Sequence, residues 1–108
     1  MKTRYALLLS LSLSLATAAH ADETAELWTA KCKSCHGADG KAQTPTGKKE
    51  SIVDMSQPAW QKAESDAEIR KYIANGSSKN KKMKAYKDKL SPEQIDSLVA
   101  YIRTLKKG

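Results

Sequence analysis

The sequence predicts an all-α domain in which three main helices are joined by long connections. Helix caps or an apolar stripe at helical spacing mark residues 24–35, 65–75 and 91–106. Residues 37–64 are rich in Gly, Pro, Thr and Lys, and they show no strand-like alternation of apolar and polar side chains. A length of 108 residues limits the chain to one small domain.

The first 21 residues read as a secretory signal peptide rather than as part of the domain. Lys2 and Arg4 precede an apolar run over residues 5–15, and a small-x-small sequence ends at Ala21. The apolar run is too short to span a bilayer. We expect export to the periplasm and cleavage after Ala21, with Ala18 as the second choice.

The mature domain, residues 22–108, has few large apolar side chains. Of its 87 residues only 18 are large and apolar, and the chain has no Phe. Removing residues 1–21 takes away two basic side chains, so the net charge falls from +7 to +5. Small domains with so thin a core usually need a disulfide, a metal or a cofactor. The long connections 37–64 and 77–90 favour a cofactor that the loops enclose.

The first helix, residues 24–35, is predicted from its start and its apolar face. Asp22 and Glu23 supply negative charge near the helix N-terminus, and Thr24 can cap it. Three side chains then share one face. They are Leu27, Trp28 and Cys32.

The second and third helices each begin with a capping box, in which a serine and the side chain three residues on satisfy each other's backbone N–H groups. Ser65 pairs with Glu68, and Ser91 pairs with Gln94. Pro92 suits the first position of the third helix. Five apolar residues recur along that helix at helical spacing. They are Ile95, Leu98, Val99, Ile102 and Leu105.

The chemistry lies in the pentapeptide Cys-Lys-Ser-Cys-His at residues 32–36, which closes the first helix. Two thiols at this spacing can both add to the vinyl groups along one edge of a porphyrin, and His36 can then lie beneath the iron as an axial ligand. We therefore predict one covalently attached c-type haem per chain, bound through Cys32 and Cys35.

Other readings of the pentapeptide have less support. A thioredoxin-like redox pair needs a strand before it and a helix that starts at the first cysteine. A zinc site needs more ligands than the two Cys and one His of residues 22–108. A structural disulfide between Cys32 and Cys35 is the simplest alternative.

Nucleic acid is a poor partner despite the basic charge, because no binding motif accompanies the lysines.

From the pentapeptide through Met83 to the helix at residues 91–106, the chain resembles the class I monohaem cytochromes c of the small bacterial periplasmic type. The resemblance covers essentially all of residues 22–108. It implies a cytochrome c fold, with three main helices and long loops wrapped around the covalent haem and with the first and last helices crossing. The side chains that should meet at this crossing are Leu27, Trp28, Leu98, Tyr101 and Ile102.

The second axial ligand is less constrained by the sequence alone. The other histidine, His20, lies at the predicted cleavage site, which leaves Met55, Met83, a lysine or an open position. The resemblance implies Met83, because the family places its methionine ligand in this loop and an aromatic residue, here Tyr86, soon after it. It gives Met55 a packing role.

The resemblance gives roles to two further residues, and the chain departs from it at a third. The Pro45 carbonyl is expected to accept the Nδ1–H of His36, and Trp60 is expected to cover a propionate or pack against the haem. Lys84 stands where the family commonly has Pro after the methionine. We therefore expect Met83 to be held loosely and exchanged more easily at high pH.

These features imply an electron carrier, not an enzyme, that is monomeric and shuttles single electrons between redox partner proteins. Six lysines near Met83 could steer an acidic partner, although a solvated loop is the simple alternative. They are Lys79, Lys81, Lys82, Lys84, Lys87 and Lys89. Alternative functions are a haem enzyme or gas sensor with a labile sixth ligand, a detachable cytochrome subunit of a larger oxidoreductase, and a disulfide-bonded module without haem.

Overall fold

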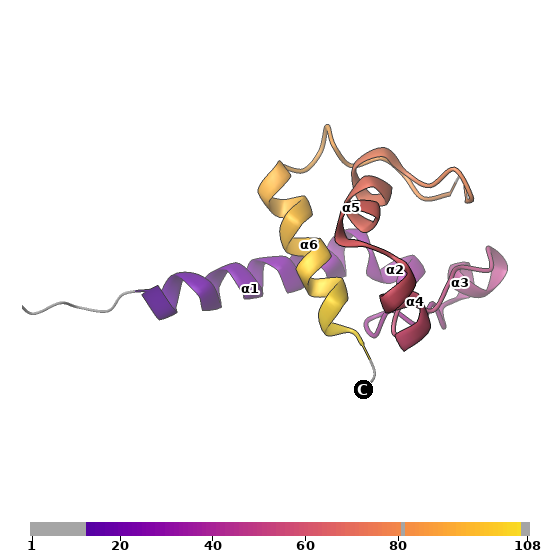
Figure 1. Ribbon diagram of the computed structural model, residues 1–108, viewed down its shortest axis with the longest axis horizontal. Coiled ribbons are helices and arrows are strands. Elements are labelled where there is room, and N and C mark those ends of the chain that lie inside the picture. Colours follow the sequence, from indigo (N-terminus) through magenta and orange to yellow (C-terminus); the bar gives the residue numbers. More distant parts are fainter. Residues whose placement is uncertain (1–12, 81, 107–108) are drawn as a thin grey trace, which may run out of the picture.

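The computed structural model describes residues 13–80 and 82–106, and within these residues it contains helices and no strands (Figure 1). The all-α prediction is therefore confirmed. The helices are α1 (Leu13–Lys31), α2 (Lys33–His36), α3 (Pro45–Lys49), α4 (Pro58–Ala63), α5 (Asp66–Asn75) and α6 (Pro92–Thr104).

The first helix differs from the prediction at both ends. It begins at Leu13 rather than near Thr24, because the preceding residues are rich in the strong helix formers Ala and Leu. It ends at Lys31, and Cys32 is the N-cap of the separate short helix α2. Helix α1 thus runs unbroken through Ala21. The signal peptide stays a prediction, since residues 1–12 lie outside the described part of the chain.

The connection over residues 37–64 is not wholly irregular, as it contains α3 and α4. Both helices begin with a proline, whose fixed φ and missing N–H suit the first helical position. Thr44 caps α3 by accepting the Gly47 N–H. Residue pairs 44–45 and 57–58 therefore carried a start signal that the prediction overlooked.

The two later helices agree closely with the prediction. Both capping boxes are formed, at Ser65 with Glu68 in α5 and at Ser91 with Gln94 in α6. The last helix ends at Thr104, two residues before its predicted end. Local sequence decides these boundaries because the cap and the apolar stripe agree.

The core forms where α6 packs against both α1 and α5 (Figure 1). Trp28 from α1 is 2% exposed, and its ring centroid lies 5.2 Å from that of Tyr101 in α6. Leu98 and Ile102 are buried in the same cluster, and Leu27 packs against it. The predicted crossing of the first and last helices is therefore confirmed.

Within residues 13–80 and 82–106, no helix is both long and apolar enough to cross a membrane.

Candidate haem site

The break between α1 and α2 places both thiols on one tight turn. The Cys32 N–H donates to the Trp28 carbonyl oxygen at 2.8 Å, and the His36 N–H donates to the Cys32 carbonyl oxygen at 3.0 Å. Both cysteines are free and half-buried, and Cys32 packs against the core.

Burial keeps two of these side chains neutral. It raises the pKa of the Cys32 thiol to about 11, and the neighbouring Cys35 adds to this shift. Burial also lowers the pKa of His36, which favours the neutral imidazole that binds a metal. Cys32 and His36 are thus presented as uncharged side chains along the edge of the core.

His36 lies against the aromatic part of the core, and one of its ring nitrogens has no protein partner. Its ring centroid is 5.9 Å from that of Trp28. Its Nδ1 atom is buried and makes no hydrogen bond, so the predicted bond to the Pro45 carbonyl is absent from the structure. Pro45 instead occupies the first position of α3, a short helix that follows the His36 loop.

Thr44 and Gly47, on either side of Pro45, fasten this loop to the cysteine turn. The Thr44 hydroxyl donates to the Cys35 carbonyl oxygen at 2.8 Å and accepts the Gly47 N–H at 2.8 Å. A Cβ on Gly47 would clash with the Ala42 carbonyl and lie 2.8 Å from the Cys35 carbonyl oxygen. The prediction named neither Thr44 nor Gly47, although the Thr-Pro pair at a helix start is a recognisable signal.

Trp28 supplies a second attachment. Its Nε1–H donates to the Gly37 carbonyl oxygen at 3.0 Å in a buried hydrogen bond. The Ala42 N–H donates to the His36 carbonyl oxygen at 2.9 Å. Because these bonds flank His36, the crossing of α1 and α6 fixes the backbone that carries the imidazole.

Met83 lies on the loop between α5 and α6 and is half-buried against the same core cluster as Cys32. The Tyr86 N–H donates to the Ile73 carbonyl oxygen at 2.9 Å, and the Tyr86 hydroxyl donates to the Lys31 carbonyl oxygen at 3.3 Å. Burial raises the pKa of Tyr86, and the nearby thiols add to the shift. The loop that carries Met83 therefore reaches the cysteine turn.

Met55 and Trp60 take different positions. Met55 is 5% exposed inside the core, which agrees with a packing role. Trp60, on α4, is half-buried and packs against the core from outside. The buried Gln61 amide, which the prediction missed, donates to the carbonyl oxygens of Met55 at 2.8 Å and Ile102 at 3.0 Å and so ties α4 to α6.

The donor set fits a c-type haem. It combines two free thiols on one turn, a neutral imidazole whose Nδ1 is buried without a partner, and a half-buried thioether. Among the described residues, no group of three or more His, Cys, Asp and Glu side chains could hold a metal ion by itself.

The fold resembles that of solved c-type cytochromes. The KustC0563 c-type cytochrome superposes with a TM-score of 0.71 at 33% sequence identity, covering 78% of this chain and 98% of that chain. A point mutant of the same cytochrome gives a TM-score of 0.68 at 32% identity, covering 77% and 98%. The domain is thus a c-type cytochrome of the class I monohaem type, which transfers electrons through a covalently bound haem c.

The sequence narrows this class further. Residues 19–102 match the family described as cytochrome C oxidase, cbb3-type, subunit III, and the chain belongs to that family. One relative is the Cbb3-type cytochrome c oxidase subunit FixP of Azorhizobium caulinodans, 33% identical over 88 residues. Another is the Cbb3-type cytochrome c oxidase subunit CcoP of Rubrivivax gelatinosus, 35% identical over 96 residues.

These two relatives are much longer than the present chain. The alignments cover 82% and 86% of this chain but 28% and 30% of the relatives. The chain therefore spans less than a third of their length. The likeness concerns the cytochrome domain that the proteins share.

Proposed function

We propose that this chain is a periplasmic one-electron carrier in which Cys32 and Cys35 hold the haem as thioethers, while His36 and Met83 are the axial ligands. The bound haem supplies the one-electron chemistry, and a thioether ligand favours its ferrous state. The protein's task is to hold both ligands in fixed positions. We expect electron transfer to partner proteins and no catalysis by this chain itself.

One contact carries this proposal. The Tyr86 hydroxyl donates to the carbonyl oxygen of Lys31, the residue directly before Cys32. Since Tyr86 follows Met83 by three residues, this bond brings the methionine loop to the segment that carries the thiols. Met55, the competing methionine, is enclosed in the core instead.

The visible spectrum of the haem-loaded full chain tests the ligand assignment. We expect a ferric sulfur-to-iron charge-transfer band that Met83→Leu abolishes and the matched control Met55→Leu retains. Haem should stay on the polypeptide in a denaturing gel, because thioethers survive denaturation. A band that persists in Met83→Leu would overturn the assignment, and a wild-type haem spectrum without the band would favour the enzyme or sensor with a labile sixth ligand.

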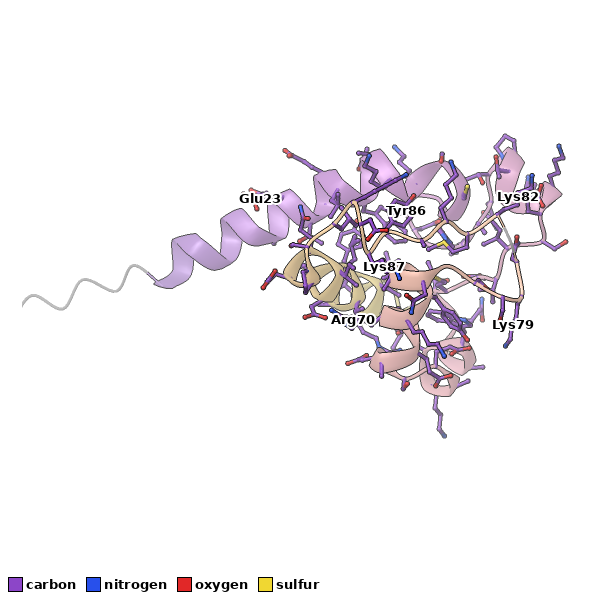
Figure 2. All side chains as sticks on the ribbon, turned by 90° about the horizontal axis from the view of Figure 1, so that it is seen from above. Glu23, Arg70, Lys79, Lys82, Tyr86 and Lys87 are labelled. Atoms are coloured by element: carbon purple, nitrogen blue, oxygen red, sulfur yellow. The ribbon has the colours of Figure 1, made fainter. Side chains whose placement is uncertain are left out.

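We further propose that lysines around the Met83 loop receive an acidic partner. Lys79 and Lys82 lie at the end of the molecule remote from Glu23 (Figure 2). The described lysines of this run are all exposed, and Lys81 lies outside the described residues. They are Lys79, Lys82, Lys84, Lys87 and Lys89. Clustered positive charge accelerates encounter with a negative partner, and salt screens the effect.

Oxidation of the ferrous protein by the anion ferricyanide measures this field. The rate should fall as ionic strength rises, and Lys82→Glu should lower it further at low salt. Lys62→Glu on α4 is the matched charge-reversal control. Equal rates for the two variants, or a rate independent of salt, would contradict steering by this loop.

The same cytochrome could serve as an electron-transfer subunit of a larger oxidase. The names of the two relatives favour this second candidate, as both are cbb3-type oxidase subunits. Fractionation of the native host distinguishes the two roles. A free shuttle should be recovered from the periplasm after cleavage near Ala21, whereas a subunit should co-purify with an oxidase from the membrane.

A further inference from the structure

The loop between α5 and α6 has to hold Met83 although the next residue, Lys84, does not fix the backbone as a proline would. A proline would restrict the backbone directly at that position. The structure holds this loop by another means, which centres on Asn80.

Asn80 makes hydrogen bonds in three directions. Its backbone carbonyl oxygen accepts the Met83 N–H at 3.1 Å. Its side-chain Oδ1 accepts the Lys82 N–H at 3.0 Å, which is an Asx turn. Its side-chain Nδ2 donates to the Glu50 carbonyl oxygen at 3.2 Å. The backbone on the N-terminal side of Met83 is thus folded around this one residue.

The residues before Asn80 fix the start of the same turn. The Ser77 hydroxyl oxygen accepts the N–H groups of Lys79 at 3.2 Å and of Asn80 at 3.3 Å. Gly76 has a φ of +78°, and a Cβ there would lie 2.7 Å from the Met83 carbonyl oxygen. The loop therefore returns closely onto the end of α5.

The bond to Glu50 links two parts of the chain that are distant in sequence. Glu50 is the C-cap of α3, on the loop that Thr44 and Gly47 fasten to Cys35. The loop of Met83 extends toward the same end of the molecule as α3 (Figure 1). Since Asn80 is half-buried, this bond is less exposed to competition from water than a bond at the surface.

We propose that Asn80 is the positioning residue for Met83, which it holds through the turn to Lys82 and the bond that ties this loop to Glu50. Asn80 does not touch the iron in this assignment and acts only through the loop. The inference rests on the proposed ligation by Met83. In this role Asn80 supplies the backbone rigidity that Lys84, unlike a proline, does not provide.

Displacement of the methionine by added imidazole in the ferric, haem-loaded chain tests this role. Asn80→Ala removes both side-chain bonds, so imidazole should bind about tenfold more tightly than to the wild type. Asn80→Asp keeps an acceptor for Lys82 but has no donor for Glu50, and we expect an intermediate change. Ser78→Ala, an exposed neighbour, is the matched control and should match the wild type.

The spectrum separates failure of this inference from failure of the ligand assignment. A wild-type protein without the charge-transfer band would overturn ligation by Met83 and the inference with it. If the wild type has the band, equal imidazole affinities in Asn80→Ala and Ser78→Ala would overturn the role of Asn80 alone. If the alanine variant does not fold, equal affinities in Asn80→Asp and Ser78→Ala would overturn the bond to Glu50. Faster amide hydrogen exchange at Met83 in Asn80→Ala than in the wild type would support the positioning role of Asn80.

Discussion

The segment that carries His36 and the segment that carries Met83 differ in how their backbones are held. Around His36 the attachments run to the core itself, through the buried bond from Trp28 to Gly37 and the close contact of Gly47 with the cysteine turn. Around Met83 the backbone pairs with the end of α5 through the bond from Tyr86 to Ile73. The side-chain attachments of this loop are the turn at Asn80 and part-buried or exposed bonds to the C-cap of α3 and the last residue of α1. The side-chain bonds near His36 are more deeply buried than the side-chain bonds near Met83.

This contrast suggests a division of roles between the two sides. Bonds shielded from water hold a group in place more firmly than bonds that water can replace. We therefore expect the histidine side to decide whether haem is attached and the domain folds. We expect the methionine side to decide how firmly the sixth ligand is held, with smaller effects on stability.

The largest effect should come from the thiols. Replacing both Cys32 and Cys35 by alanine removes the two thioether attachments, so we expect complete loss of covalent haem. Haem staining of a denaturing gel measures this, and Ser34→Ala on the same turn is the control. Haem that stayed attached to the double variant would show that the proposed attachment residues are wrong.

Gly47→Ala should be the most damaging single change on the histidine side outside the pentapeptide. The new methyl group has backbone atoms of Ala42 and Cys35 in its way, and neither can rotate aside. We expect a loss of about 1–3 kcal/mol in the free energy of unfolding. Urea unfolding of the haem-loaded protein measures it, with Thr46→Ala, an exposed neighbour on α3, as control. Equal midpoints for the two variants would refute the close packing.

Trp28→Phe keeps an aromatic ring in the core but removes the donor to Gly37. The buried Gly37 carbonyl then loses a partner, and we expect a loss of about 1–2 kcal/mol in the same unfolding measurement. Trp60→Phe, the other tryptophan, is the control because it packs from outside the core. If Trp60→Phe cost as much stability as Trp28→Phe, the buried bond would not be the cause.

Tyr86→Phe should have the smallest effect. It removes a hydroxyl whose 3.3 Å bond to Lys31 is exposed, so we expect a loss of at most about 0.5 kcal/mol in unfolding free energy. Its effect should instead be seen in the ferric charge-transfer band, which reports on Met83 in the proposed ligation. A loss of stability as large as that of Trp28→Phe would remove the contrast between the two sides.

Short-range patterns predicted the parts of the site that depend on neighbouring residues. Both capping boxes form as expected, since each depends on two residues three positions apart. The crossing of α1 and α6 was implied by the family resemblance, and the structure confirms it. The start of the first helix was predicted wrongly, because the residues on the N-terminal side of Thr24 are also helix formers and carry no signal that separates them from the helix.

Contacts between distant segments were out of reach of such patterns. The Thr44 hydroxyl donates to the Cys35 carbonyl oxygen, and the Asn80 side-chain amide donates to the Glu50 carbonyl oxygen. The Arg103 guanidinium donates to the carbonyl oxygens of Gln61 and Glu64, each at 2.6 Å. These bonds depend on how the loops return to the core. No local pattern encodes that return, although each polar side chain involved was visible in the sequence.

The sequence by itself predicted the chemistry: the Cys-Lys-Ser-Cys-His pentapeptide at residues 32–36 as the expected haem attachment, the three main helices, and a core with few large apolar side chains. These properties depend on residue type and on spacings of a few positions. The tertiary structure decided how the two sides of the site are held, through Trp28 and Gly47 on one side and through Asn80 on the other. Bringing such side chains to their partners requires the loops to return to the core. Trp28 and Gly37 are 9 residues apart in the sequence, and Asn80 and Glu50 are 30 apart.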